Sequence, residues 1–462
     1  MTNVLLLVSD EHNPRYSSTY GHAVVRTPNM DRLAARGTVY ENAYCPSPLC
    51  VPSRTAFMSG RYTHETQAYN NSKVVERRHP SYGGVLAEQG VHTVYVGGGS
   101  NLYRDPYTLG FSEMLNVART GRSLGTHAIQ AERPSRRPMR TTAACGPVED
   151  RYSEDDAHID DAIAWLQTRA PGLDRPWTMT IDINPPHPPY TTAPEYWEMY
   201  QGQGDLPTCG ADQESAHHPY AQDVRDNGRW DFDEELVRSL RQGYFGAVTY
   251  VDDQLGRLLD ALESVGLTDD TLVCYTSDHG EMLGKFGMWG KTSLYEDSAR
   301  IPMIAAGPGV APGQWASTPV SSLDLQATLF HAVGARRPEA WRGTPLQHIP
   351  AEDPGRTVFA SYHGHNQRGG SFLLRRGDWK LLYNTAAPSQ LFNLRDDPEE
   401  LVNQWAERPE VVEELEAELR AVCDPEAVDR DAAAVREQQY QAEQWLAGQY
   451  GSKTRLVPWE GT

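Results

Sequence analysis

Short, continuously hydrophobic segments alternate with helical patterns along the first 350 residues. The run at 3–9 (NVLLLVS) is hydrophobic at nearly every position, which is typical of a strand buried on both faces of a parallel sheet. Segments with hydrophobic residues at helical spacing follow each such run. Further strands are expected at 91–96, 179–183, 271–276 and 301–305, and helices at 27–36, 52–58, 82–89, 156–167, 233–262 and 322–333. This alternation predicts an α/β fold with a largely parallel sheet.

The pattern changes after about residue 350. Four short strands are expected at 357–363, 371–375, 379–383 and 390–393, with a helix at 410–422 after them. Short strands separated by turns indicate a small antiparallel sheet that carries this helix. We therefore expect a catalytic α/β domain over 1–350, a smaller α+β domain over 351–425 and a polar helical extension over 426–462. The extension is a candidate for contacts between copies in a homo-oligomer.

Composition narrows the functional classes. The chain of 462 residues has 42 basic and 62 acidic side chains, a net charge of −20. This balance argues against binding to nucleic acid or to an anionic membrane, although a local cation can still attract an anionic substrate. The six cysteines are too sparse for a disulfide scaffold, and no hydrophobic run is long enough to span a membrane. Without a basic segment before its first hydrophobic run, the chain is expected to be cytoplasmic.

Acidic residues and a histidine follow two of the expected central strands. Asp10 and Glu11 end the first strand, and Asp278 and His279 follow the strand at 271–276. Ligands of open parallel sheets bind at the carboxyl ends of the strands, so these side chains are expected to converge. Two carboxylates and an imidazole suit a divalent cation such as Ca²⁺, Mg²⁺ or Mn²⁺. The alternative is that they only cap the loops that follow.

The segment Cys50-Val51-Pro52-Ser53-Arg54 places a potential nucleophile at a helix start. With Pro52 and Ser53 in the first turn, residue 50 is expected beside free N–H groups and the positive end of the helix dipole. Arg54 lies one turn along and can reach back. This arrangement indicates an anion site next to a nucleophile. The alternative is a buried cysteine that precedes an ordinary helix.

Together these segments resemble the formylglycine-dependent sulfatases. The C-x-P-S-R motif is followed by Gly60-Arg61-Tyr62, and the segments TPNMDRLA, TSDHGEMLG, GDWKLLY and LFNLRDDPEE extend the likeness over the whole chain. The resemblance implies a fold like that of alkaline phosphatase, with a large central sheet flanked by helices and a small C-terminal antiparallel sheet. It also implies that a formylglycine-generating enzyme oxidises Cys50, and that the substrate is a small anionic ester.

The residue pairs that follow the two strands narrow the resemblance to one branch of the family. Asp10-Glu11 and Asp278-His279 are similar to the branch that contains choline sulfatases and phosphonate monoester hydrolases. In that branch the metal ligands correspond to Asp10, modified Cys50, Asp278 and His279, and Ca²⁺ is the first expectation, ahead of Mn²⁺ or Mg²⁺. Glu11 stands where the branch usually has Gln, so the resemblance leaves its role as a ligand open.

Further positions match family residues that contact the substrate. Asn71 resembles a substrate-contacting Asn, Lys291 a late Lys of the site, and His187 in the loop NPPHPPY a His near the leaving group. Sulfatases usually carry a Lys after the strand that corresponds to 93–96, and this chain has Gly97-Gly98-Gly99-Ser100-Asn101 there. Ser100 or Asn101 is the expected substitute. Candidates for the wall around the organic group are Tyr16, Tyr20, His12, Tyr103, Trp289, His363 and His365.

The resemblance implies hydrolysis of sulfate esters through a covalent sulfo-enzyme intermediate on residue 50. The metal and Asp278 would activate a hydroxyl of the hydrated aldehyde, and His187 or Lys291 would protonate the leaving oxygen. Arg54, Lys291 and the metal would stabilise charge on the transferred group. Two alternatives stay open: a phosphonate monoester or phosphodiester hydrolase that uses the same site, and a catalytically silent, metal-binding relative.

Overall fold

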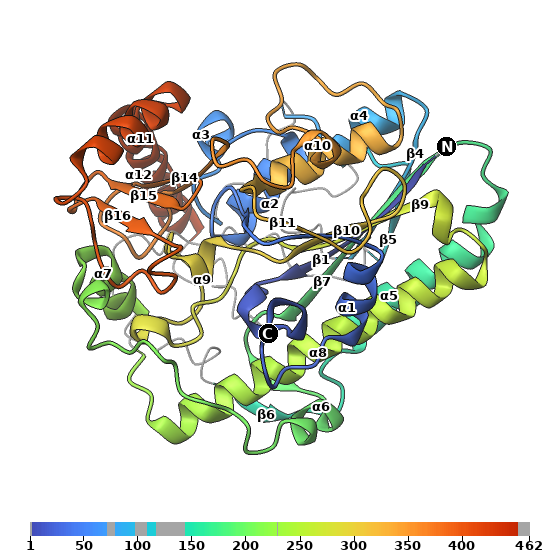
Figure 1. The fold of residues 1–462 in the computed structure, drawn as a ribbon, viewed down its shortest axis with the longest axis horizontal. Coiled ribbons are helices and arrows are strands. Elements are labelled where there is room, and N and C mark those ends of the chain that lie inside the picture. The colour runs from blue at the N-terminus through green and yellow to red at the C-terminus, as the bar shows by residue number, and fades with distance from the viewer. Residues whose placement is uncertain (1, 72–78, 98–108, 117–143, 229, 451–462) are drawn as a thin grey trace.

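A central sheet of eight strands organises the molecule, in the order β11-β2-β10-β9-β1-β7-β4-β5 (Figure 1). The computed structural model describes residues 2–71, 79–97, 109–116, 144–228 and 230–450, with side chains to residue 441. The strands of this sheet are β1 (Asn3–Asp10), β2 (Gly37–Tyr40), β4 (His92–Gly97), β5 (Glu113–Leu115), β7 (Trp177–Pro186), β9 (Thr271–Ser277), β10 (Met303–Ala306) and β11 (Gln314–Ala316).

The sheet is mostly parallel, as expected from its strand–helix alternation. β1 lies at its centre and pairs in parallel with β7 and β9, with Leu5 opposite Met179 on one side and Val273 on the other. One strand departs from this direction, because β10 runs antiparallel to both β9 and β2. The hydrophobic run at 301–305 predicted a strand there but carried no information on its direction.

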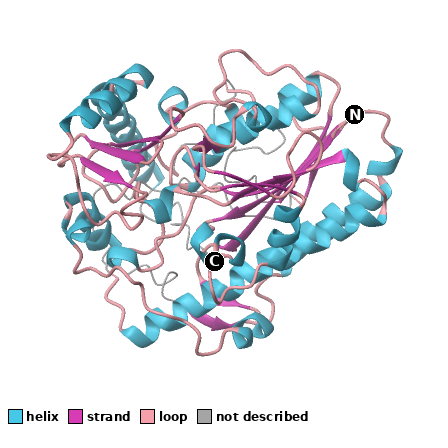
Figure 2. Ribbon diagram, viewed as in Figure 1, coloured by secondary structure: helices cyan, strands magenta, loops and turns pink. Residues whose placement is uncertain are grey.

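Helices cover both faces of the sheet (Figures 1 and 2). Successive residues of a strand point to opposite faces, so Leu5 and Leu7 belong to one hydrophobic cluster and Leu6 and Val8 to another. The first cluster includes residues of α1 (Pro28–Ala35), α5 (Ser153–Thr168) and α8 (Glu234–Ser264). The second includes residues of α2 (Cys50–Ser59), α4 (Tyr82–Glu88) and α10 (Ser322–Ala332).

The C-terminal part forms a four-stranded antiparallel sheet, as predicted. Its strands are β13 (Thr357–Tyr362), β14 (Ser371–Arg376), β15 (Trp379–Asn384) and β16 (Gln390–Asn393), and α11 (Pro409–Val422) packs on them. The last helix, α12 (Pro425–Tyr450), packs against the same hydrophobic cluster through Val428 and Ala432. The first turns of the expected extension are therefore part of this core.

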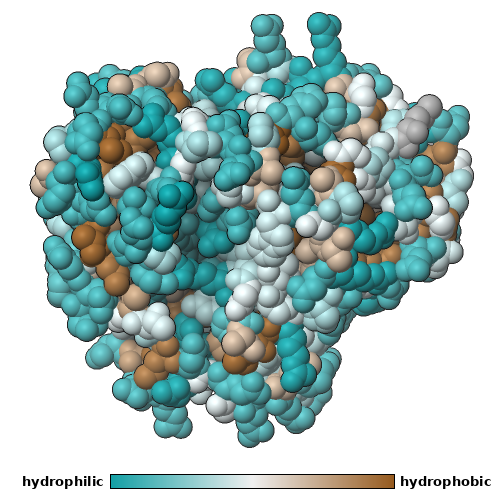
Figure 3. Space-filling view, viewed as in Figure 1, coloured by the Kyte–Doolittle hydropathy of each residue, from teal (hydrophilic) through white to brown (hydrophobic). Residues whose placement is uncertain are grey.

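Several short elements gave no pattern in the sequence, because two to four residues are too few to show a period. They are β3 (Ala43–Tyr44), β6 (Cys145–Pro147), β8 (Tyr190–Thr192), β12 (Val320–Ser321), α3 (Thr63–Thr66) and α9 (Glu296–Ala299). Two further helices, α6 (Pro194–Met199) and α7 (Pro219–Gly228), lie between β8 and α8. Within the described residues no helix has the length and hydrophobicity to cross a membrane. The face in Figure 3 is mainly hydrophilic, with small, scattered hydrophobic patches.

Candidate active site

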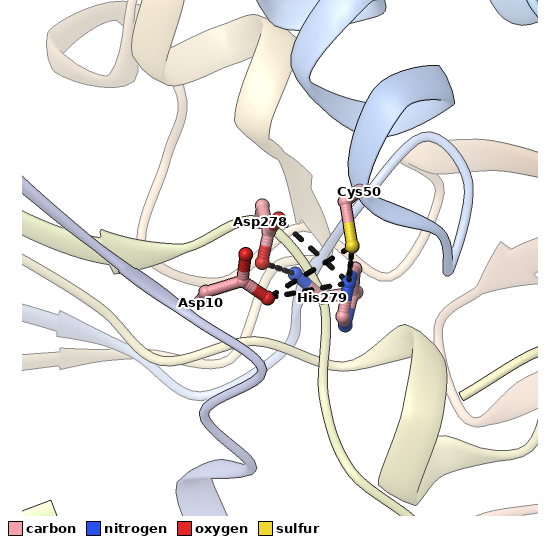
Figure 4. Close-up of side chains that lie close together, drawn as sticks. All are labelled: Asp10, Cys50, Asp278 and His279. Atoms are coloured by element: carbon pink, nitrogen blue, oxygen red, sulfur yellow. Dashed lines mark hydrogen bonds and ion pairs between the residues drawn. The ribbon is translucent and has the colours of Figure 1, made fainter. Parts of the chain in front are cut away.

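The carboxyl ends of β1 and β9 bring Asp10, Asp278 and His279 together at the centre of the sheet (Figure 4). The two strands stay in register up to Ser9 and Ser277, so the residues that follow meet at the same edge. The backbone N–H of Glu11 donates a hydrogen bond to Asp278 Oδ1 at 3.1 Å, which ties the two strand ends together. All of these side chains are buried.

Cys50 joins this group from the start of α2. The helix begins at Cys50 itself, two residues earlier than the proline and serine suggested, with Leu49 as its N-cap residue. Cys50 Sγ lies 3.3 Å from His279 Nε2 and 4.0 Å from Asp10 Oδ1. Burial and the neighbouring Asp10 raise the pKa of the Cys50 thiol. The unmodified side chain is therefore a protonated thiol at neutral pH, which makes it a poor nucleophile.

The donor atoms around Cys50 fit a divalent cation. One ligand atom each from Asp10, Cys50, Asp278 and His279 lies within 4.8 Å of the others. His279 Nδ1 donates to the carbonyl of Gly280 at 3.0 Å, which leaves Nε2 as an acceptor facing the cluster. Burial lowers the pKa of His279 to about 4, so the ring is neutral at pH 7. Burial and the adjacent Asp278 raise the pKa of Asp10, a repulsion that a cation would offset.

Arg54 holds the acids of the site in place. Its Nε lies 2.8 Å from Asp278 Oδ2, its Nη2 3.1 Å from Asp10 Oδ2 and its Nη1 2.8 Å from Asp182 Oδ2. Burial alone would raise the pKa of Asp278, but Arg54 brings that pKa down to about 2. Every nitrogen of the guanidinium therefore faces a carboxylate.

Asp182, on β7, is a site residue that we did not anticipate from the sequence. It faces Arg54, and the hydroxyl of Tyr95 on β4 donates to its carboxylate. Burial raises the pKa of Asp182, and Arg54 counters part of that rise. The available signal was an acidic residue inside a hydrophobic strand (TIDIN), because a buried charge generally needs a partner.

Glu11, Lys291 and His187 form a second group beside the first. Lys291 Nζ donates to Glu11 Oε2 at 2.7 Å, and His187 Nε2 lies 3.4 Å from the same oxygen. Ligand atoms of Asp10, Glu11 and His187 also lie within 4.8 Å of one another. Glu11 has a positive φ of 71°, and its side chain pairs with Lys291. Burial lowers the pKa of His187 to about 4, with a smaller contribution from Lys291.

Six of the remaining predicted residues fall in three places. Asn71 Oδ1 accepts a hydrogen bond of 3.1 Å from the backbone N–H of Val51, next to Cys50. Ser100 and Asn101 lie outside the described residues, as does Tyr103. Among the wall candidates, His12 is buried and bonded to Tyr275 and Ser17, and Tyr16 packs against Tyr244 and Phe245. These two side chains belong to the interior.

Comparisons with known proteins agree with this geometry. The model of the sulfatase family matches residues 2–335, and that of the C-terminal region of N-sulphoglucosamine sulphohydrolase matches residues 284–424. A choline-sulfatase of Rhizobium meliloti (strain 1021) is 30% identical and is aligned over 99% of this chain and 93% of its own length. Human arylsulfatase K is 28% identical over 96% of this chain and 85% of its own length.

Solved structures share the fold. The structure of BT4656 in complex with its substrate D-glucosamine-2-N,6-O-disulfate superposes with a TM-score of 0.73 at 20% identity, covering 96% of this chain and 98% of that one. The phosphonate monoester hydrolase SpPMH from Silicibacter pomeroyi superposes with a TM-score of 0.71 at 22% identity, covering 91% and 94%. The acids at two strand ends and the C-x-P-S-R helix start agree with a family model that covers most of the length. The chain therefore belongs to the sulfatase family and is a sulfuric-ester hydrolase.

Proposed function

We propose that this chain hydrolyses sulfate esters with a formylglycine formed from Cys50 and one bound divalent cation. The observation that carries the proposal is the convergence of Cys50 Sγ on His279 Nε2 and Asp10 at the start of α2. In the mature enzyme an oxygen of the modified residue would replace this sulfur. The sulfate group would then be transferred to residue 50 and released by a second hydroxyl, which a simple serine lacks.

Asp10, Asp278, His279 and residue 50 would hold the cation. Mostly oxygen ligands favour Ca²⁺, and the single imidazole keeps Mn²⁺ and Mg²⁺ as alternatives. When bound, the cation would acidify a hydroxyl of residue 50 and attract the anionic substrate. The geometry argues against Glu11 as a ligand, since its carboxylate pairs with Lys291 and is not part of the four-residue cluster.

The protein's own side chains would supply the rest of the chemistry. Arg54 pairs with Asp10, Asp278 and Asp182 and favours their ionised forms, so we assign it to positioning these acids. Lys291, which pairs with Glu11 beside the four-residue cluster, would stabilise charge on the transferred group. Lys291 would donate a proton to the leaving oxygen, and His187, whose lowered pKa leaves the ring neutral at pH 7, would do so only in its protonated form. Asn71, Ser100 and Asn101 would contact the substrate.

A second candidate activity is hydrolysis of phosphonate monoesters or phosphodiesters at the same site. It is favoured by the segment Gly97–Asn101, which lacks the lysine that sulfatases usually place there. Rates on matched aryl sulfate and aryl phosphonate esters would separate the two activities. Choline sulfate belongs in the same panel because one relative is named choline-sulfatase.

The decisive measurement is the chemical state of residue 50. We expect mass spectrometry of the peptide that contains it to show oxygen in place of sulfur after co-expression with a formylglycine-generating enzyme. Cys50→Ala should abolish hydrolysis and leave the fold intact, whereas Cys423→Ala, at a half-buried cysteine between α11 and α12, should retain full activity. Full activity of Cys50→Ala would disprove the formylglycine mechanism.

Removal of the metal tests the second part of the proposal. Chelation should abolish activity, and Ca²⁺ or Mn²⁺ should restore it at one ion per chain. Metal content measured by mass spectrometry of the intact protein gives a readout that does not depend on turnover. Asp10→Asn should lose the ion, and Glu11→Gln should retain it. An active, metal-free protein would contradict the proposed cation site.

A further inference from the structure

The last helix, α12, lies beyond the ends of both family models, which stop at residues 335 and 424. It is nevertheless fixed to the molecule. Asp429 accepts hydrogen bonds from the N–H of Gly370 at 2.7 Å and from the hydroxyl of Thr385 at 2.9 Å, both beside strands of the C-terminal sheet. Figure 1 shows α12 behind β14 and β15, on the side that faces α3 and α2.

One turn of α12 holds the segment that leads into the active site. The carboxylate of Asp431 accepts a hydrogen bond of 2.7 Å from the hydroxyl of Tyr69 and bonds of 3.0 and 3.1 Å from Nε2 of Gln67. Tyr69 is buried, and its ring packs edge-on against His363 of the C-terminal domain at 5.1 Å. A charged acceptor makes stronger bonds than a neutral one, so Asp431 is the main anchor.

A second contact lies farther along the same helix. Gln439 Oε1 accepts a hydrogen bond of 2.9 Å from Nδ2 of Asn70, which is buried. The next residue is Asn71, whose Oδ1 receives the N–H of Val51. Val51 follows Cys50, so a continuous path of hydrogen bonds and chain runs from α12 to the first turn of α2.

We propose that α12 is a positioning element of the active site. Asp431 and Gln439 hold residues 67–70 so that the amide of Asn71 stays on the N–H beside residue 50. In this position Asn71 both satisfies a free N–H of the helix start and fixes the orientation of its own amide toward the substrate. The inference rests on the proposed function only in using hydrolysis as its readout and in giving Asn71 a substrate contact.

A double-mutant cycle between Asp431 and Asn71 tests the path. Asp431→Ala and Asn71→Ala should each lower kcat/KM by about tenfold, the loss typical of one buried hydrogen-bonded group. The double variant should be no slower than either single variant, because Asp431 acts through Asn71. Rates are divided by the fraction of residue 50 that carries the aldehyde, as determined by mass spectrometry, so that incomplete maturation does not enter the comparison.

Two further variants separate positioning from simple stabilisation. Asp431→Asn keeps an acceptor for the Tyr69 hydroxyl and should recover most of the lost activity. Glu437→Gln changes an exposed charge on the same helix, where Glu437 bonds to Gln441, and should leave kcat/KM unchanged. If Asp431 had a purely structural role, Asp431→Ala would lower the melting temperature. The losses of kcat/KM in Asp431→Ala and Asn71→Ala would then multiply in the double variant.

Multiplicative losses in the cycle, or an Asp431→Ala variant with unchanged kcat/KM, would overturn the positioning role. Neither result would affect the proposed function, because that function is tested separately by the activity of Cys50→Ala. If Asp431→Ala proves too unstable to assay, Gln439→Ala provides the same cycle with a weaker, neutral contact. In the Asn71→Ala background, Gln439→Ala should cause no further loss of kcat/KM, and a loss that persists there would refute the proposal.

Discussion

At the scale of single residues, the geometry of the site depends on the guanidinium of Arg54. The nitrogens of Arg54 face Asp10, Asp182 and Asp278, so three carboxylate charges are fixed by one planar group. Burying three carboxylates this close together is costly unless a cation pairs with them. Arg54 therefore favours the ionised form of the strand-end acids, which is the form that a metal site requires.

Arg54→Lys tests this use of the guanidinium. A lysine ammonium is a compact point charge and cannot face three separate carboxylates, so we expect kcat/KM to fall by roughly 100-fold. The metal content should also drop, because at least one acid loses its partner. Steady-state kinetics and metal analysis check both effects, with Arg32→Lys at an exposed pair with Asp260 as the control. A variant within twofold of the parent would contradict the assignment.

A second prediction at this scale concerns the segment with three glycines. A lysine supplies full charge to a sulfate oxygen, whereas a serine hydroxyl supplies only a dipole. Installing Lys at Gly99 or Ser100 should therefore raise the ratio of sulfate to phosphonate hydrolysis by roughly 10- to 100-fold on small aryl esters. Competition assays on matched esters measure the ratio directly. An unchanged ratio in folded, aldehyde-bearing variants would show that substrate choice lies elsewhere.

At the scale of elements, helix starts are held by acids from other parts of the chain. Asp252 on α8 accepts hydrogen bonds from the N–H groups of Asn29 and Met30 at the start of α1, at 2.9 and 2.7 Å. These groups have no partner within the helix, so Asp252 replaces a local cap. Gly246 on the same helix allows close packing, since a Cβ there would lie 2.9 Å from the carbonyl oxygen of Tyr196. This packing explains why α8 continues without a break.

Asp252 makes the stability of the fold depend on pH. Burial raises its pKa from 3.8 to about 7, so the folded state holds this proton more tightly than the unfolded state. Its contribution to stability is complete below about pH 4 and is lost as the pH rises to 7, with a slope of up to ~1.4 kcal/mol per pH unit. Asp252→Asn should remove this slope. Urea unfolding at pH 5 and 7 measures it, with Asp260→Asn on the exposed face of α8 for comparison.

At the scale of the whole molecule, a buried ionic group joins the C-terminal sheet to α9, the helix that precedes β10 of the central sheet. Lys380 on β15 bonds to Glu296 of α9 at 2.8 Å and to Glu400 at 2.7 Å, and Glu400 also accepts the N–H of Glu296. All three side chains are buried. The C-terminal sheet is thus attached to the part of the chain that follows Lys291, at a short distance from the active site.

Lys380→Met should strongly destabilise the molecule. It removes the nearest cation from two buried carboxylates, and such a change typically costs about 3–5 kcal/mol. Arg395→Met, which breaks an exposed pair with Asp378, should cost less than ~1 kcal/mol. The difference would appear in the midpoints of urea unfolding followed by tryptophan fluorescence. Equal midpoints for the two variants would mean that the buried group stabilises the fold no more than the exposed pair does.

The sequence by itself determined the features that depend on neighbours along the chain. The periods of hydrophobic residues predicted the central strands β1, β7 and β9 and the helices around them. The acids after β1 and β9 and the cysteine of the C-x-P-S-R motif were recognisable because each is a local pattern with a chemical meaning. The four-stranded C-terminal sheet followed from short strands separated by turns.

Tertiary structure alone decided the rest, because the deciding contacts join segments that are far apart in sequence. The direction of β10 is set by its partners β2 and β9. Asp182 belongs to the site only because β7 lies next to β1. The turn of Glu11 toward Lys291 depends on a positive φ, and the docking of α12 on the segment before Asn71 depends on Asp431. Hydrophobic periodicity reports whether a residue is buried, but it does not report which distant residue it will meet.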